Sequence, residues 1–179
     1  MGFQSPQFDF IDQRFSPRHM KTLEVLCSKH VQATSSDPQE IDISGTYNGT
    51  PAFSPATGQL LPGNRIVVSD IDPGATVIPN KVCNIFLVTW SIVDSTGDVL
   101  EGPFTTTVAD AVKCPGAGLG PNQTVIQKHD IQVMFCTTPV DTDDDGAFDV
   151  VYVTLDVEYC LVVAQEVVLK VNVAQPFCP

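Results

Sequence analysis

The chain has 179 residues, enough to bury one sizeable hydrophobic core with room for a tail. Its composition, 43% hydrophobic and 17% charged, is too apolar for a disordered chain, and its apolar runs are too interrupted for a membrane span of about 20 residues. Nine Lys and Arg against 21 Asp and Glu give a net charge of −12, which repels phosphate backbones and anionic lipids. We therefore expect no nucleic-acid partner and no membrane span.

Residues 1–22 are predicted to form an extended N-terminal arm. Its aromatic residues, Phe3, Phe8, Phe10 and Phe15, are scattered among Gln, Ser, Pro and Asp without a steady period. Aromatic side chains are costly to leave in water, so we expect the arm to pack on its own domain or on a neighbouring subunit. A partly ordered tail is the alternative, because chain termini are often poorly ordered.

Residues 23–175 are predicted to form a β-sandwich domain. Residues 20–33 can be written as a strand or as a short helix, and the alternation that begins at Leu23 favours a strand. A brief strand is expected at residues 41–43. Residues 45–63 are rich in Gly, Pro, Ser and Thr, a composition typical of a long surface loop that can face a partner.

The middle of the chain predicts a series of antiparallel strands. Residues 65–71 are a β-branched run, and Asp72-Pro73-Gly74 is expected to end it in a turn. Residues 82–93 predict a central strand that buries one face, formed by Phe86, Val88, Trp90 and Ile92. A turn at residues 95–98 closes a hairpin, and further strands are expected at residues 99–108 and 124–136.

The clearest strand signal lies in the last third of the chain. Every second residue from Val151 to Val163 is apolar, and Thr154, Asp156 and Glu158 lie between them, which predicts one buried and one exposed face. Because the alternation resumes near residue 169, a tight turn or a bulge is expected at residues 164–166. About eight strands joined by Pro- and Gly-rich turns predict an all-β fold, a β-sandwich or jelly roll.

Six cysteines are dispersed along the chain, at Cys27, Cys83, Cys114, Cys136, Cys160 and Cys178. No two form a CxxC pair, which argues against zinc ribbons and thioredoxin-type redox motifs. An even number of dispersed cysteines in a strand-rich chain favours disulfides and an oxidising compartment. The alternative is that several of them are small buried hydrophobic residues.

An acidic segment between two predicted strands resembles a calcium-binding loop. Its carboxylates at alternate positions are Asp141, Asp143, Asp145 and Asp149. Together with Gly146, they match positions 1, 3, 5, 6 and 9 of such a loop, but the twelfth position is Tyr152 and strands flank the segment, which excludes an EF-hand. The two interpretations are a calcium site and a solvated acidic hairpin.

No catalytic constellation stands out in the sequence. Cys27-Ser28-Lys29-His30 is half of a zinc-binding spacing, but no second close pair completes it. The chain has three histidines, His19, His30 and His129, and lacks a Gly-x-Ser-x-Gly elbow. We therefore predict that the protein is not an enzyme. A small hydrolase that uses an unrecognised carboxylate pair is an alternative.

The two termini have features of an assembly subunit. Residues 176–179 are predicted to be a tail in which Cys178 lies between Phe177 and Pro179, so that it can reach another chain. The arm, together with Cys27 close behind it, favours subunits linked end to end by arm insertion or β-augmentation. Residues 1–6 lack the basic and apolar regions of a signal peptide.

In its arm, its strand-borne cysteines and its tail cysteine, the chain resembles the spore-surface appendage subunits of endospore-forming bacteria. These are leaderless β-sandwich proteins joined by disulfides between subunits. The resemblance implies a homopolymeric fibre or coat, extracellular or on a cell or spore surface. A calcium-dependent binding or adhesion module, with residues 45–63 as its ligand surface, is the main alternative.

Overall fold

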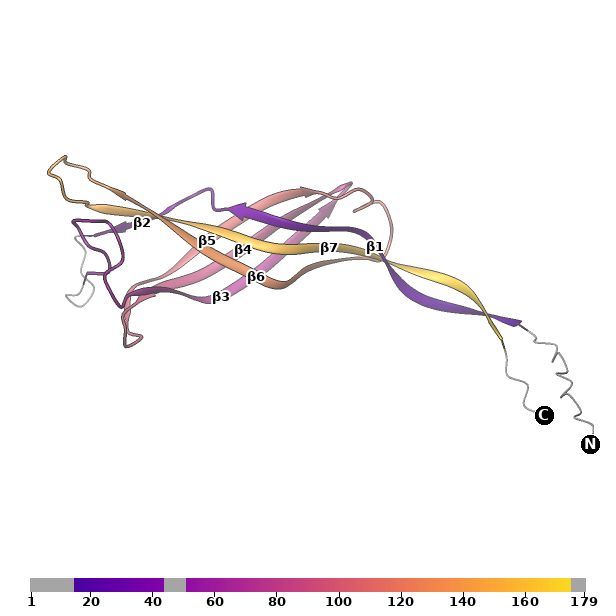
Figure 1. Ribbon diagram of the computed structural model, residues 1–179. Coiled ribbons are helices and arrows are strands. Elements are labelled where there is room, and N and C mark those ends of the chain that lie inside the picture. Colours follow the sequence, from indigo (N-terminus) through magenta and orange to yellow (C-terminus); the bar gives the residue numbers. More distant parts are fainter. Residues whose placement is uncertain (1–14, 44–50, 175–179) are drawn as a thin grey trace, which may run out of the picture. The chain divides into compact units, whose positions relative to one another are not determined.

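The computed structural model describes residues 15–43 and 51–174, with the backbone alone at residues 15–19, 128–130 and 171–174 (Figure 1). The fold of this part is all-β, as predicted. Seven strands are present in it, in agreement with the predicted number of about eight. They are β1 (Phe15–Thr34), β2 (Gln39–Asp42), β3 (Arg65–Ile78), β4 (Lys81–Val93), β5 (Val99–Lys113), β6 (Gln123–Val140) and β7 (Val150–Ala174).

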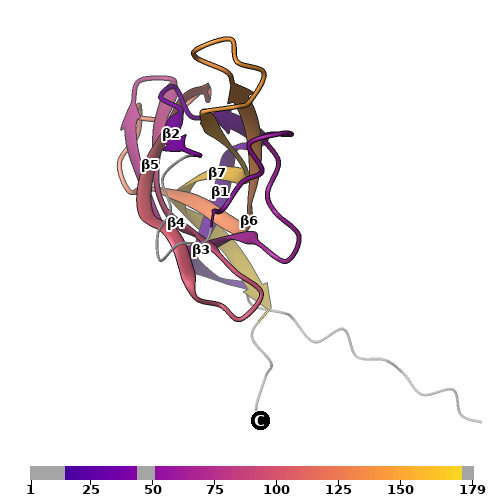
Figure 2. The same cartoon turned by 90° about the vertical axis from the view of Figure 1, so that its left-hand side faces the viewer.

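The strands form two sheets. In the first, β7 pairs antiparallel with β6 along one edge, from Val150 to Gln165, and has β2 and β1 as its other neighbours. In the second, β4 lies between β3 and β5, antiparallel to both. The inner faces of both sheets contribute to one hydrophobic core, and Figure 2 shows the sheets facing each other. This arrangement is a β-sandwich.

The buried faces are those that the alternation predicts. Phe86, Val88, Trp90 and Ile92 of β4 are fully buried, and the odd-numbered residues from Val151 to Val163 of β7 are at most 1% exposed. Trp90 donates a hydrogen bond from Nε1 to Thr106 Oγ1 (3.0 Å), and its ring packs against Phe104 and Phe135. Each fully buried large apolar side chain stabilises the fold by roughly 1.5–3 kcal/mol, so these two strands hold much of its stability.

A polar network crosses this core. Asp110 of β5 accepts hydrogen bonds from Tyr159 Oη (2.8 Å) of β7 and from Asn84 Nδ2 (2.8 Å) of β4. Gln127 of β6 donates from Nε2 to Asn84 Oδ1 (2.8 Å) and to the carbonyl oxygen of Gly74 (2.9 Å) in β3. Burial, followed by the hydrogen bond to Asp110, raises the pKa of the Tyr159 phenol. The network therefore connects five strands from both sheets through paired polar groups.

The turn predicted at Asp72-Pro73-Gly74 is wrong, because β3 continues through it to Ile78. Pro73 lies opposite Phe86 in the register, in a strand at the end of its sheet. Proline lacks an N–H, but an edge strand tolerates it where no ladder hydrogen bond is required. The hairpin turn lies further along, at Asn80, whose φ of 62° is in the left-handed region that asparagine tolerates.

The predicted break at residues 164–166 is also wrong, because β7 is one strand of 25 residues. Val163 and Leu169 are six residues apart, an even number, so the apolar alternation returns on the same side of the strand without an inserted residue. Neither a turn nor a bulge is needed for this pattern.

The chain divides into two compact units, residues 25–165 and a smaller unit of residues 1–24 and 166–179. The larger unit is the sandwich. The sequence places residues 166–175 in the sandwich domain, whereas the structure groups residues 166–174 with the N-terminal segment. In the described part of the smaller unit, residues 15–24 of β1 pair with residues 166–174 of β7, and we call this two-stranded segment the ribbon (Figure 1).

Candidate functional site

The acidic loop between β6 and β7 brings three of its four predicted ligands together. Asp141, Asp143 and Asp149 each offer one carboxylate oxygen, and these oxygens lie within 4.8 Å of one another. Asp145 lies outside this group and accepts a hydrogen bond from the Ala147 N–H (2.8 Å). Gly146 has a φ of 91°, so it provides the turn that its position in the sequence predicts.

Backbone N–H groups hold these carboxylates in place. Asp141 accepts hydrogen bonds from the N–H groups of Asp144 (2.8 Å) and Gly146 (2.9 Å). Asp149 Oδ2 accepts from the N–H (2.7 Å) and the hydroxyl (2.5 Å) of Thr142. The Thr142 hydroxyl, followed by its N–H, lowers the pKa of Asp149, which keeps this carboxyl ionised. The loop is therefore preorganised with three negative charges on one side.

Asp42 of β2 adds negative charge near this loop. It raises the pKa of Asp149 and thus opposes part of the effect of Thr142. It also raises the pKa of Glu101, for which burial is the larger cause. Calcium takes six to eight oxygen ligands. The three carboxylates could supply part of this set, and water or carbonyl oxygens would have to supply the remainder.

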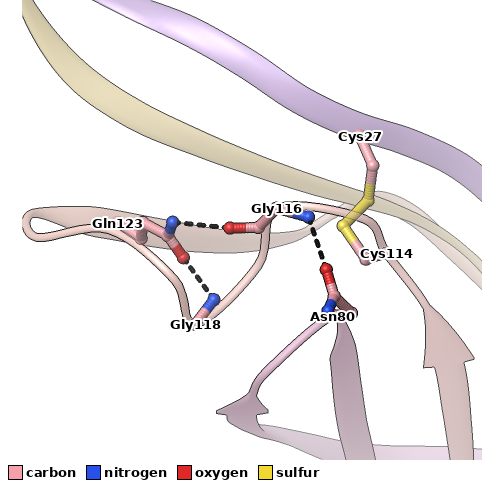
Figure 3. Close-up of a disulfide and its surroundings, with 6 residues drawn as sticks. All are labelled: Cys27, Asn80, Cys114, Gly116, Gly118 and Gln123. Atoms are coloured by element: carbon pink, nitrogen blue, oxygen red, sulfur yellow. Dashed lines mark hydrogen bonds between the residues drawn. A yellow bond between two sulfur atoms is a disulfide. The ribbon is translucent and has the colours of Figure 1, made fainter.

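A disulfide joins Cys27 of β1 to Cys114, the residue after β5, with a Cα–Cα distance of 5.8 Å (Figure 3). The prediction that the chain contains a disulfide is confirmed, and the bond fits an oxidising compartment. Cys27, one of the predicted disulfide candidates, is thus bonded within its own chain, to Cys114. The bond also removes Cys27 as a thiolate ligand for zinc.

The loop that follows Cys114 is fixed by its own hydrogen bonds (Figure 3). Gln123 donates from Nε2 to the carbonyl of Gly116 (2.9 Å) and accepts from the N–H of Gly118 (2.7 Å). The Gly116 N–H donates to Asn80 Oδ1 (3.0 Å), in the turn between β3 and β4. A Cβ on Gly118 would lie 2.7 Å from the carbonyl carbon of Ile78, so only glycine fits this close approach.

Three cysteines of the described part are free. Cys83 is half-buried on β4, and Cys136 on β6 and Cys160 on β7 are exposed. Cys136 lies opposite Thr154, so both exposed thiols are on the outer face of the first sheet. Cys178 lies outside the described residues.

Several other predicted residues fall wholly or partly outside the described part. Phe3, Phe8 and Phe10 lie outside it, and Phe15 is the first residue of β1, described by its backbone only. Of the histidines, His30 has a described side chain, and its Nε2 lies 3.5 Å from Glu158 Oε1 in an exposed pair.

The sequence reasoning missed an open groove on the outer face of the second sheet, which we call the outer groove. Its volume is about 330 Å³, and it is lined by Asp72, Gly74, Ala75, Thr76, Cys83, Ile85 and Leu87. Ile85 is 48% exposed and Leu87 is 40% exposed. The signal lies in residues 82–93, where the residues between the buried ones are also partly apolar.

Comparison of the chain with protein-family models, with curated proteins and with solved structures finds no match. Within residues 15–43 and 51–174, no helix has the length and apolar character needed to cross a membrane.

Proposed function

We propose that this chain is a structural subunit of an extracellular or spore-surface fibre or coat, which assembles with copies of itself and has no catalytic role. The observation that carries the proposal is the ribbon, which exposes large apolar side chains. They are Met20 (56% exposed), Leu23 (59%), Val168 (59%) and Leu169 (49%). Because successive residues of a strand point to opposite faces, these side chains expose apolar surface on both faces of the ribbon, which is typical of a segment that another molecule covers.

The backbone of the ribbon supports the same role. β1 is an end strand of its sheet, and the pairing of β6 with β7 stops at Gln165. Beyond that residue, among the described strands, β7 has β1 alone as its partner. A two-stranded segment is marginally stable in water at best, and its free N–H and C=O groups can pair with another chain. Both effects favour a ribbon that is covered in an assembly.

Disulfides between subunits would reinforce such an assembly. Cys83, Cys136 and Cys160 are free thiols at least partly accessible on the sandwich, while Cys27 and Cys114 are joined within the chain. An environment that maintains the internal bond would also oxidise accessible thiols that meet at a contact between subunits.

Charge on the ribbon should prevent assembly. We expect the wild-type protein to form polymers that grow with concentration in sedimentation velocity and are visible by electron microscopy. The double variant Leu23→Asp/Val168→Asp should remain a monomer, because each carboxylate would have to be desolvated at the contact. Non-reducing electrophoresis would identify the covalent fraction.

The matched control is Leu119→Asp/Met134→Asp, which adds the same charge at exposed apolar residues outside the ribbon. It should assemble as the wild type does. A wild-type protein that is monomeric at every concentration, with and without reductant, would contradict the proposed function.

A second candidate function is a calcium-dependent binding or adhesion module, and the convergence of Asp141, Asp143 and Asp149 favours it. Repulsion among these carboxylates, increased by Asp42, would be offset by a bound cation. The ligand would bind elsewhere on the surface, with residues 45–63 as the predicted region, of which residues 51–63 are described.

Calcium should raise the melting temperature if this loop binds it, because an ion bound by the native state alone stabilises that state. The gain is about 2.7 kcal/mol at a free concentration 100 times the dissociation constant. Asp149→Asn should abolish the shift in a thermal melt with and without chelator. Asp145→Asn, in the same loop but outside the group of three, should retain most of it. Identical melting curves in millimolar calcium and in chelator would exclude the site.

A further inference from the structure

We propose that the ribbon of one copy docks into the outer groove of a second copy. This inference rests on the proposed function and deepens it, because it names the two surfaces that meet. They differ from each other, so the contact is heterologous, and each copy retains one free ribbon and one free groove. Such a contact extends into an open polymer unless its rotation closes a ring.

The outer groove has a surface shape that suits an apolar docking site. Ile85 lies between Gly74 of β3 and Ala109 of β5 in the register, and Cys83 lies between Thr76 and Ala111. The large side chain of Ile85 is thus flanked by Gly74 and Ala109, which leaves a depression on each side of it. A strand pair that carries Leu and Val side chains can fill such depressions, and burial of this apolar surface would stabilise the contact.

The distribution of charge decides which part of a second copy fits there. The unit of residues 1–24 and 166–179 has four basic and four acidic residues, a net charge of zero. The sandwich unit, residues 25–165, therefore has five basic and 17 acidic residues, a net charge of −12. Two sandwich surfaces repel each other, whereas the ribbon can approach a sandwich without this penalty.

Charged side chains at the two surfaces add to this complementarity. Asp72 lines the groove, and the ribbon has exposed Lys21 and Lys170. In the free chain, Lys21 Nζ pairs with Glu166 Oε1 at 2.6 Å, but its side chain is 76% exposed. An exposed pair of this kind contributes little to stability, so it would not compete strongly with a new contact to Asp72.

The test uses two variants that each disable one half of the contact. Leu23→Asp/Val168→Asp disables the ribbon, and Ile85→Asp/Leu87→Asp disables the groove. Each should weaken self-association at least tenfold and sediment as a monomer at concentrations where the wild type assembles. When the two are mixed in equal amounts, the intact ribbon of one should bind the intact groove of the other. The expected product is a 1:1 heterodimer and nothing larger.

The outcomes separate the inference from the proposed function. A wild-type protein that is always monomeric, including one whose ribbon folds onto its own groove, overturns both. Polymers formed equally well by the groove variant overturn the inference and leave assembly standing. Failure of the mixture to form the heterodimer also overturns it. Thermal melts check that the variants fold. If the groove variant does not fold, Ile85→Ser/Leu87→Ser replaces it.

Discussion

Replacing Cys27 with serine should lower the free energy of unfolding by about 2–5 kcal/mol. The bond between Cys27 and Cys114 joins residues 87 positions apart. In the chain-entropy model, a loop of this length constrains the unfolded chain by an amount worth about 4–5 kcal/mol. The loss should appear as a lower midpoint in urea unfolding under non-reducing conditions.

The control for this variant is Cys160→Ser, which removes an exposed thiol that is free in the structure. Exposed substitutions usually change stability by less than about 0.5 kcal/mol, so its midpoint should stay near that of the wild type. Equal midpoints for the two variants would mean that the bond does not stabilise the native chain. A reductant should bring the wild type to the level of Cys27→Ser.

The buried faces of the sandwich were predictable because the side chains of a strand point to the same face at every second residue. In a half-buried strand, apolar and polar residues alternate along the sequence, and the apolar ones identify the buried face, as they do in β7 from Val151 to Val163. The same local rule failed at Pro73, because whether proline ends a strand depends on whether that strand lies at an edge. Edge position is a property of the sheet, which one segment of sequence does not contain.

The candidate sites were predictable to different degrees. The acidic loop is contiguous in sequence, so its carboxylates could be named, although the exclusion of Asp145 depends on the path of the backbone. The partner of Cys27 could not be named, because six cysteines allow 15 pairings. The outer groove combines β3 and β4, and only their register places Gly74 beside Ile85.

Replacing Asp110 with alanine should destabilise the sandwich by about 2–5 kcal/mol, because two buried donors would lose their acceptor. Tyr159 is 1% exposed and Asn84 is fully buried, and both donate to this carboxylate. A buried donor left unpaired costs about 1–3 kcal/mol. Equilibrium unfolding in urea measures the loss. A matched control is Asp98→Ala, which removes a carboxylate from an exposed turn.

A double-mutant cycle with Tyr159→Phe tests whether the cost arises from the unpaired donors. Phenylalanine retains the ring that packs on Phe86 at 4.6 Å between centroids but removes the hydroxyl. Once the hydroxyl is absent, loss of Asp110 leaves Asn84 as the one unpaired donor, so the double variant should be more stable than the two single losses predict. Additive losses would mean that Asp110 and Tyr159 act independently. Non-additivity would show that the two sheets are coupled through this polar contact as well as through apolar packing.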